Sequence, residues 1–372
     1  MALSLHTKLC DMLDIEYPIM AFSHCRDVVA AVSNAGGCGV LGTVWLSPEE
    51  ITAEVKWLKA NTDKPFAIDV AFRTANQEID TVERLLTKVP QEYKDFMDGI
   101  KKDLGLPEEI PGTRLERPYI GPEGAYESVK RQWEAAIKEK PAVFAAALGV
   151  TREAIEEAHA AGIKVISLVG NVKNARRVAE LGVDIIVAQG TEAGGHTGRI
   201  GTMALVPQIV DAVSPIPVLA AGGIGDGRGL VAALALGAVG VWTGTIWLPV
   251  HESPLADWIK DRMLEAADED AVITRVYTGK TARGLRNKYI DLWTQPGALP
   301  TLPMPLQGIY HPMPWSVYTE DPTSLAIFNT PQLREWVSTA SGNIVGLING
   351  RKSARQVLYD MVTQAVDILG TE

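Results

Sequence analysis

A single histidine lies in a glycine-rich loop whose residue types suit acid–base chemistry. His196 follows Gly194 and Gly195, and all three belong to residues 189–198 (QGTEAGGHTG). Because an imidazole titrates near neutral pH, such a loop could present a general base or hold a bound anion. A histidine that only forms a hydrogen bond within its own loop is the alternative. Among the six histidines of the chain, we expect His196 to be the catalytic one.

Two further glycine-rich turns could bind a phosphate group. One lies at residues 220–225 (AAGGIG) and contains Gly222 and Gly223, and the other lies at residues 243–245 (TGT) and contains Gly244. Glycine lets the main chain approach phosphate oxygens, and the start of a short helix adds a favourable dipole. We expect these turns to hold a phosphate-bearing cofactor or substrate. Tight connections between a strand and a helix would account for the same glycines.

Polar side chains gather in two more places. Residues 23–26 (SHCR) follow an apolar run, and His24 is the candidate there for a contact with substrate. Cys25 has no partner at a fixed spacing, so little supports a nucleophilic role for it. Asp69 lies in another apolar run, where its carboxylate could accept a hydrogen bond from a heterocycle or cap a turn of the backbone.

The elements that must position these residues alternate between short apolar runs and amphipathic stretches. Eight apolar runs predict strands at residues 17–22, 38–42, 66–70, 143–148, 164–169, 185–189, 217–221 and 239–243. The intervening stretches predict helices at residues 26–34, 48–60, 151–160, 171–180, 203–213 and 227–236. Eight such repeats predict an α/β protein with a (β/α)8 TIM barrel. The candidate residues would then meet where the strands end, which is where such barrels carry their active sites.

Two regions depart from this repeat. Residues 74–140 hold charged helical stretches around a Pro/Gly-rich connector, and residues 248–349 combine helical segments with a proline-rich loop. The barrel is therefore predicted over residues 1–73 and 141–247, and a C-terminal helix within residues 350–372 completes it. We expect the first of the two regions to be a helical insertion and the second to be a helical and loop region that covers the substrate.

Composition excludes several classes of protein. The formal charge is 35 − 45 = −10 and the sequence pI is near 5.2, which leaves little positive charge for nucleic acid or an anionic membrane surface. No apolar run approaches the roughly 20 residues of a membrane span, and Lys8, Asp11 and Asp14 make the N-terminal segment unlike a signal peptide. Three irregularly spaced cysteines give neither a disulfide framework nor a zinc site. We expect a cytoplasmic protein with a small-molecule partner and no nucleic acid, membrane or metal.

Two segments resemble the nitronate monooxygenase family, a group of FMN-dependent (β/α)8 enzymes related to the flavin-containing enoyl-ACP reductases. They are residues 31–42 (AVSNAGGCGVLG) and 188–198 (AQGTEAGGHTG). The resemblance extends to residues 282–287 and the C-terminal helix, and it is thin over residues 74–140. It implies FMN as the cofactor and His196 as the catalytic base.

The resemblance also implies a set of cofactor contacts. The FMN phosphate would lie on the two glycine turns, and Gln189 and Gly194 would lie along the isoalloxazine ring. The full set of FMN-binding residues that it implies is Ala21, Phe22, Ser23, Asp69, Gln189, Gly194, Gly195, Gly222, Gly223, Thr243, Gly244 and Thr245.

Three departures from the family pattern lie at the substrate end. Residues 21–24 (AFSH) stand where the family usually has an Ala-Pro-Met type of turn, and Trp242 stands near a position that often carries a smaller or polar residue. Asp69 stands where the family usually has Asn, which removes an amide donor. These departures leave the expectation of FMN in place and the substrate open.

The activity that the resemblance implies is oxidation of an alkyl nitronate or a similar carbanionic substrate with O2, giving a carbonyl compound and nitrite. An FMN-dependent NAD(P)H reductase acting on a quinone or an enoyl thioester is the alternative, and a flavin-free barrel that binds a phosphorylated metabolite is a third. Nine tryptophans could line an apolar cavity or pack in the core or at a subunit interface, so a homodimer stays open.

Overall fold

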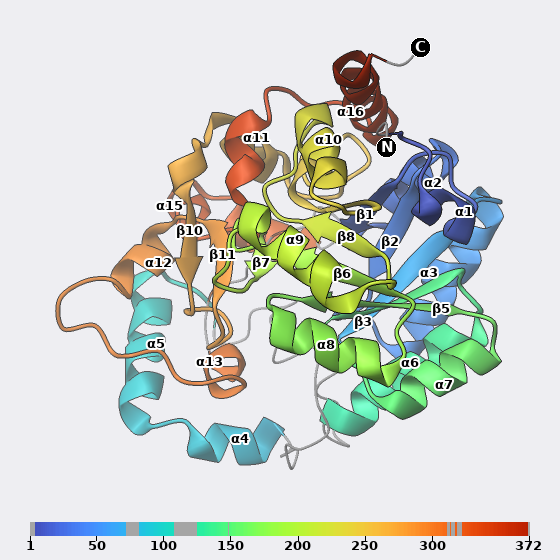
Figure 1. Ribbon diagram of the computed structural model, residues 1–372. Coiled ribbons are helices and arrows are strands. Elements are labelled where there is room, and N and C mark those ends of the chain that lie inside the picture. The colour runs from blue at the N-terminus through green and yellow to red at the C-terminus, as the bar shows by residue number, and fades with distance from the viewer. Residues whose placement is uncertain are drawn as a thin grey trace.

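Eight parallel strands close into a barrel in the order β1-β2-β3-β4-β5-β6-β8-β9, and β9 pairs with β1 (Figure 1). The computed structural model describes residues 4–71, 82–107, 125–147, 149–310, 313, 317 and 322–370. The barrel strands are β1 (Ile19–Ser23), β2 (Cys38–Gly42), β3 (Phe66–Ala71), β4 (Val143–Ala147), β5 (Lys164–Val169), β6 (Ile185–Gln189), β8 (Val218–Ala221) and β9 (Gly240–Thr243). The predicted (β/α)8 barrel is confirmed. Each predicted run forms a strand, although Leu148, the last residue of one run, lies outside the described residues.

Helices cover the outside of the barrel. They are α2 (Arg26–Asn34), α3 (Pro48–Asn61), α6 (Ala125–Lys138), α7 (Arg152–Ala160), α8 (Val172–Leu181), α9 (Thr202–Val213), α10 (Gly227–Ala235) and α16 (Ala354–Leu369). Local sequence explains where they begin and end. Before α3, Ser47 and Glu50 each accept a hydrogen bond from the other's amide, at 3.1 and 2.7 Å, which forms a capping box. Asn171 caps α8, and Gly182 ends it at a positive φ.

Two hydrophobic layers hold the barrel together. Side chains inside the barrel, such as Met20 and Val187, form one buried cluster. Helix α1 (Lys8–Leu13) closes the amino end of the barrel, because its Leu9 and Leu13 join that cluster. Side chains that alternate with these along the strands pack against the surrounding helices and form a second, larger cluster. The carboxyl ends of the strands are thus left for function.

A third hydrophobic cluster joins the two regions outside the barrel repeat. Tyr289 donates its hydroxyl to Met97 Sδ at 3.7 Å, and Tyr310 donates to Asp98 Oδ1 at 2.8 Å. Figure 1 accordingly shows the cyan α5 beside the orange α12 and α13. The helices of these regions are α4 (Val82–Lys88), α5 (Gln91–Asp103), η1 (Thr245–Trp247), α11 (Asp257–Glu265), η2 (Asp268–Asp270), α12 (Lys288–Leu292), α13 (Leu306–Ile309), α14 (Pro322–Phe328), α15 (Pro331–Arg334) and η3 (Asn343–Leu347).

A small antiparallel sheet lies outside the barrel. Its strands, in the order β10-β11-β7, are β10 (Ala271–Thr274), β11 (Ala282–Leu285) and β7 (Gly195–His196). This sheet connects the region after β9 to the loop that follows β6 (Figure 1). Among the described helices, none combines the length and apolar character that a membrane crossing requires.

Candidate active site

His196 is held by strand pairing with a distant part of the chain. It forms β7 together with Gly195, and β11 pairs with it so that Ala282 lies opposite His196 and Arg283 opposite Gly195. The amide of Thr197 extends the pairing by donating to Thr281 O at 3.2 Å. The loop after β6 is therefore not a free glycine-rich loop but the edge of a sheet.

The side chain of His196 has a defined partner at one ring nitrogen. Its Nε2 lies 2.9 Å from Thr278 Oγ1, and Thr278 is almost fully buried. Gln189, the last residue of β6, donates its side-chain amide to the carbonyl of His196 at 3.1 Å. The predicted catalytic residue and one predicted cofactor contact are thus brought together at the carboxyl end of the barrel.

The two glycine turns lie next to each other at the same end, because Ala221 at the end of β8 pairs with Trp242 on β9. Gly222 and Gly223 have φ values of +92° and +74°, which favour glycine. A Cβ atom on Gly222 would lie 2.9 Å from the amide nitrogen of Ala193, so this turn and the His196 loop are in close contact.

These turns present unused hydrogen-bond donors. Within the part of the chain that the structure describes, the amide N–H groups of Gly223, Gly244 and Thr245 donate to no acceptor. Amides without a protein acceptor on two adjacent turns are suited to bind an anion such as a phosphate. The residues present therefore fit the phosphate group that the sequence resemblance implies.

The threonine side chains beside Gly244 support the turn from within the protein. Thr243 Oγ1 donates to Met20 O at 3.2 Å and accepts the indole N–H of Trp247 at 3.0 Å. Thr245 Oγ1 accepts the amide of Gly342 at 2.9 Å. Both threonine side chains are buried, so only their main-chain groups could contact an anion.

Residues 340–343 complete this end of the site, and sequence reasoning missed them. Besides the contact with Thr245, the amide of Asn343 donates to Glu192 O at 3.0 Å. A Cβ atom on Gly194 would lie 2.8 Å from the amide nitrogen of Gly342, so the two backbones are packed directly together. This segment ties the His196 loop to the turn after β9. It carries no motif, and only its small residues hint at the close approach.

An aromatic group lies at the end of β1. Phe22 stacks on Trp242 with ring centroids 6.1 Å apart, and the rings of Phe22 and His24 meet nearly at right angles with centroids 5.1 Å apart. Ser23 accepts the amide of Cys25 at 3.1 Å. Ala21 is fully buried in the layer between strands and helices, so only its main chain remains for a ligand.

His24 and Cys25 are both engaged by protein carbonyls. His24 Nδ1 lies 2.9 Å from Gly42 O, so Nδ1 carries the proton and donates it. Part of His24 is exposed, yet the protein atoms around the ring lower its pKa by burial. The thiol of Cys25 is buried and donates to Glu252 O at 3.3 Å. Both side chains serve the local structure, and His24 also keeps an exposed face.

Asp69 is a buried carboxyl group in the second half of β3. Its Oδ1 accepts the amide of Ala147 from the neighbouring strand at 3.2 Å. Burial raises its pKa to about 7, although the hydrogen bond from Ala147 opposes that shift. Asp69 therefore binds the last residue of β4, and its raised pKa lies near neutral pH.

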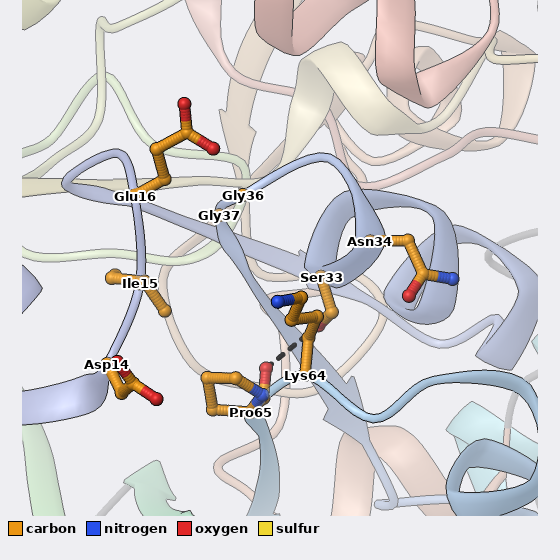
Figure 2. Close-up of a pocket in the computed structure, with 9 residues that line it drawn as sticks. All are labelled: Asp14, Ile15, Glu16, Ser33, Asn34, Gly36, Gly37, Lys64 and Pro65. Atoms are coloured by element: carbon orange, nitrogen blue, oxygen red, sulfur yellow. Dashed lines mark hydrogen bonds between the residues drawn. The ribbon is translucent and has the colours of Figure 1, made fainter.

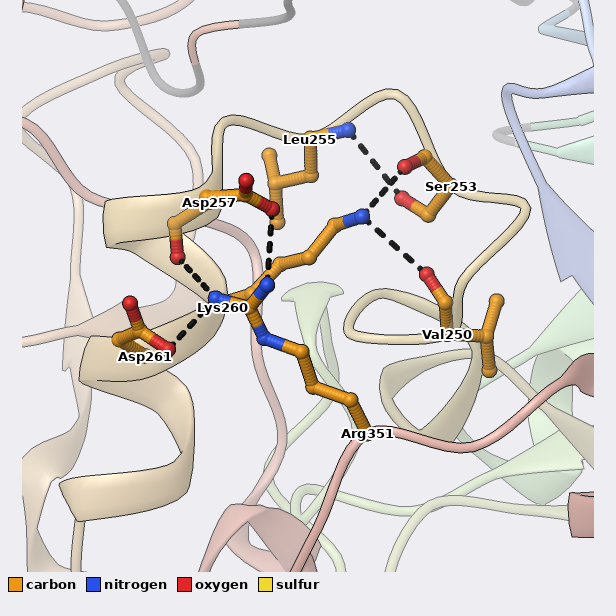
Figure 3. Close-up of polar contacts among 7 residues, drawn as sticks. All are labelled: Val250, Ser253, Leu255, Asp257, Lys260, Asp261 and Arg351. Carbon is orange, nitrogen blue, oxygen red and sulfur yellow. Dashed lines mark hydrogen bonds and ion pairs between the residues drawn. The ribbon is translucent and has the colours of Figure 1, made fainter.

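A buried lysine braces the chain just after the second glycine turn (Figure 3). Lys260 donates to the carbonyls of Val250 and Ser253 at 3.2 and 2.6 Å, and burial lowers its pKa. Arg351 binds Asp257 and Asp261 on the same helix, at 2.8 and 2.5 Å. These contacts fix the loop between η1 and α11.

A polar cavity at the other end of the barrel is separate from this site. It has a volume of about 90 Å³ and is lined by residues that precede β1, β2 and β3 in the chain. Figure 2 shows these lining residues. Ser33 donates to Pro65 O at 3.0 Å across it. Among the described residues, no cluster of three His, Cys, Asp or Glu side chains could hold a metal ion.

Comparison with known proteins decides the family. The family model of nitronate monooxygenase matches residues 6–322 of this chain. The chain belongs to the nitronate monooxygenase family. A Mycobacterium tuberculosis protein provisionally named as a monooxygenase is 40% identical over 379 residues, covering 98% of each chain. A Staphylococcus aureus (strain JH9) protein provisionally named as a nitronate monooxygenase is 34% identical over 313 residues, covering 80% of this chain and 83% of that one.

Solved structures share the architecture of this nitronate monooxygenase family member. FabK from Thermotoga maritima is 26% identical with a TM-score of 0.70, covering 99% of this chain and 98% of that chain. Nitroalkane oxidase from Streptomyces ansochromogenes has a TM-score of 0.76 at 24% identity, covering 96% and 98% of the chains, and supports the fold. The protein is therefore an enzyme of the oxidoreductase class, and membership of the family indicates a flavin cofactor.

Proposed function

We propose that the protein is an FMN-dependent oxidoreductase that oxidises an alkyl nitronate or a similar carbanionic substrate with O2, giving a carbonyl compound and nitrite. The observation that carries the proposal is the contact between two turns of the site. The loop that holds His196 packs against the turn at Gly222, which lies beside unused amide donors. A candidate base and a candidate phosphate site thus lie at one end of the barrel.

The amides of Gly223, Gly244 and Thr245 would hold the FMN phosphate. Gln189 and Gly194 would lie along the ring, and Phe22 with Trp242 offers an apolar surface nearby. FMN, when bound, supplies the electron acceptance that no side chain of the protein can provide, and O2 is the final acceptor. The remaining proposed contacts come from Ala21, Ser23, Asp69, Gly195, Gly222 and Thr243.

His196 would act toward the substrate carbon in one of two ways. For a neutral nitroalkane, a C–H bond breaks, its electron pair stays on carbon and spreads over the nitro group, and an N–H bond forms on the imidazole. For a nitronate that is already ionised, the imidazole would hold the anion in place. In both cases the protein positions a carbanion and excludes alternative geometries.

An anaerobic absorption experiment tests this function. The purified protein is expected to show flavin bands that bleach when a small alkyl nitronate is added, and to release nitrite and a carbonyl compound once O2 is admitted. NADH and NADPH, added to a parallel anaerobic sample, are expected to bleach the flavin slowly or not at all. A colourless protein that takes up no FMN would exclude the proposal.

A second function is favoured by the similarity to FabK over nearly the whole chain. It is an NAD(P)H-dependent reductase of a quinone or an enoyl thioester, with the same cofactor at the same turns. Fast anaerobic bleaching by NADH or NADPH, without bleaching by nitronate, would establish this function in place of the first.

A further inference from the structure

His24 and Gly42 form a matched pair at the carboxyl end of the barrel. A Cβ atom on Gly42, the last residue of β2, would lie 2.7 Å from both Nδ1 and Cε1 of His24. Because side chains essentially never approach so closely, only glycine at this position leaves room for the imidazole ring. The ring of His24, which follows β1, therefore lies against the end of the neighbouring strand.

The partner of His24 fixes where its proton lies. Nδ1 lies 2.9 Å from Gly42 O, and a main-chain carbonyl can only accept a hydrogen bond, so Nδ1 carries the proton and donates it. A neutral imidazole has a single N–H group, which leaves its second nitrogen, Nε2, with a lone pair. Burial lowers the pKa of His24, which favours the neutral ring. Nε2 is therefore a hydrogen-bond acceptor.

The protein does not use this acceptor. Among the residues that the structure describes, no group forms a hydrogen bond or an ion pair with His24 Nε2. The edge of the ring that contains Nδ1 and Cε1 faces Gly42, and the residue as a whole is exposed. The lone pair of Nε2 is thus available to a ligand.

The two aromatic neighbours of His24 offer no acceptor of their own. Phe22 meets His24 nearly at right angles with ring centroids 5.1 Å apart, and Trp242 stacks on Phe22. Both neighbours pack in the hydrophobic cluster inside the barrel. A phenyl ring has no polar atom, and an indole can only donate. A ligand that contacts this aromatic group can therefore place an O–H or N–H group only against Nε2 of His24.

His24 and His196 lie on opposite sides of the two glycine turns. Around the barrel, β6 is followed by β8, β9 and then β1. His196 belongs to the loop after β6, the glycine turns follow β8 and β9, and His24 follows β1. A cofactor phosphate on the turns would thus have the candidate base on one side and His24 on the other.

We propose that His24 determines substrate specificity by accepting, at Nε2, a hydrogen bond from an O–H or N–H group of the substrate. This inference rests on the proposed function and adds that the nitronate or nitroalkane carries a hydrogen-bond donor besides its nitro group. The oxygens of a nitro group or a nitronate are acceptors and would meet the lone pair of Nε2 unfavourably. A hydroxyl or amino group satisfies that lone pair, whereas a purely alkyl substrate leaves it without a partner.

Two substrates that differ in one group measure this preference. 2-Nitroethanol carries a hydroxyl group where 1-nitropropane carries a methyl group, and the ratio of their kcat/KM values for flavin reduction is taken within each protein. His24→Asn can still donate an amide proton to Gly42 O but has no atom in place of Nε2, whereas His24→Phe keeps a ring without nitrogens. We expect both variants to lower the ratio of hydroxyl to methyl substrate by about fivefold.

A second matched pair measures binding without chemistry. 2-Methyl-2-nitro-1-propanol and 2-methyl-2-nitrobutane again differ by a hydroxyl and a methyl group, and neither has a C–H bond on the carbon that bears the nitro group. Calorimetry gives their dissociation constants in the flavin-loaded proteins. The unsubstituted protein should bind the alcohol at least as tightly as its more hydrophobic analogue, a comparison that requires no variant to fold. Weaker binding of the alcohol would overturn the proposal.

The results separate this inference from the proposed function. If neither 2-nitroethanol nor 1-nitropropane reduces the flavin of the unsubstituted protein, the proposed function fails and this inference fails with it. If both reduce it but the ratios are equal in all three proteins, only the role of His24 is lost. If the His24 variants release flavin while the ratios stay equal, Nε2 serves the cofactor and the proposal is again overturned. Ratios that fall in both variants support it.

Discussion

The amide of Gly342 donates to Thr245 Oγ1 at 2.9 Å, which joins the C-terminal part of the chain to the turn after the last barrel strand. Both groups are buried. The neighbouring amide, that of Asn343, reaches the carbonyl of Glu192 in the His196 loop. One short segment therefore links the candidate base to the candidate phosphate site.

Thr245→Val should weaken this link. The substitution leaves the buried amide of Gly342 without an acceptor, which costs about 1–3 kcal/mol. We expect a lower free energy of unfolding in urea and weaker retention of flavin on dialysis, whereas Thr245→Ser should preserve both. Equal stability of the Val and Ser variants would show that this hydrogen bond contributes nothing.

Gly222→Ala should be more damaging than an alanine at another left-handed glycine. Gly222 has φ +92° and a Cβ there would lie 2.9 Å from Ala193 N, while Gly162 has φ +77° and open space around the same atom. A left-handed conformation costs a non-glycine residue roughly 1–2 kcal/mol, and overpacking adds about 1–3 kcal/mol. Thermal unfolding should rank the unsubstituted protein above Gly162→Ala, and Gly162→Ala above Gly222→Ala.

Flavin content distinguishes the local effect of Gly222→Ala from a general one. Gly162→Ala should retain flavin, because its turn lies between α7 and β5 at the other end of the barrel from the site. Gly222→Ala should lose flavin even at a temperature where it is folded. A fully loaded Gly222→Ala protein would argue against a phosphate at this turn.

Asp69→Asn should change how stability depends on pH. Burial raises the pKa of Asp69 from 3.8 to about 7, so the folded state keeps a proton that the unfolded state releases as the pH rises. The contribution of Asp69 to the free energy of unfolding is therefore complete below pH 3.8 and is lost as the pH rises through about 7. Between these two values it falls by about 1.4 kcal/mol per pH unit. Asn does not titrate and can still accept the amide of Ala147.

Urea unfolding at about pH 5 and at about pH 8, with the same flavin content, measures this effect. The variant should gain stability over the unsubstituted protein on going to the higher pH. If the variant and the unsubstituted protein differ in free energy of unfolding by the same amount at both pH values, Asp69 is already ionised in the folded protein at about pH 5.

His196→Asn should retain flavin and reduce it slowly. The described side-chain contact of His196 is with Thr278, so we expect the variant to keep its cofactor, whereas loss of a general base costs about 10²–10⁴-fold in rate. Anaerobic stopped-flow absorbance with a nitroalkane measures the flavin reduction rate directly. Reduction at the unsubstituted rate would remove His196 from the mechanism.

Much of the frame of the site could be predicted from the sequence. The eight apolar runs became the eight barrel strands, because burial of parallel strands on both faces leaves a strong local pattern. His196, Gly222 and Gly223 belong to short continuous runs, so the sequence alone suggests the acid–base and phosphate-binding roles that we propose for them. The order of the strands then placed them at one end of the barrel.

Side-chain direction limited the prediction for two expected cofactor contacts. Successive residues of a strand point to opposite faces. Trp242 points into the barrel, so Thr243 points outward and bonds to Met20 and Trp247, and Ala21 lies in the outer layer for the same reason. The sequence alone does not show which face of each strand points into the barrel, whereas the closed barrel does.

The sequence by itself determined the repeat of strands and helices, the histidine loop and the glycine turns, because each is written in neighbouring residues. Only the tertiary structure decided that Thr278 meets His196 and that Gly342 meets Thr245, pairs separated by 82 and 97 positions. Contacts of this kind depend on how distant segments pack around a closed barrel, and they leave no periodicity or spacing in the chain to be read.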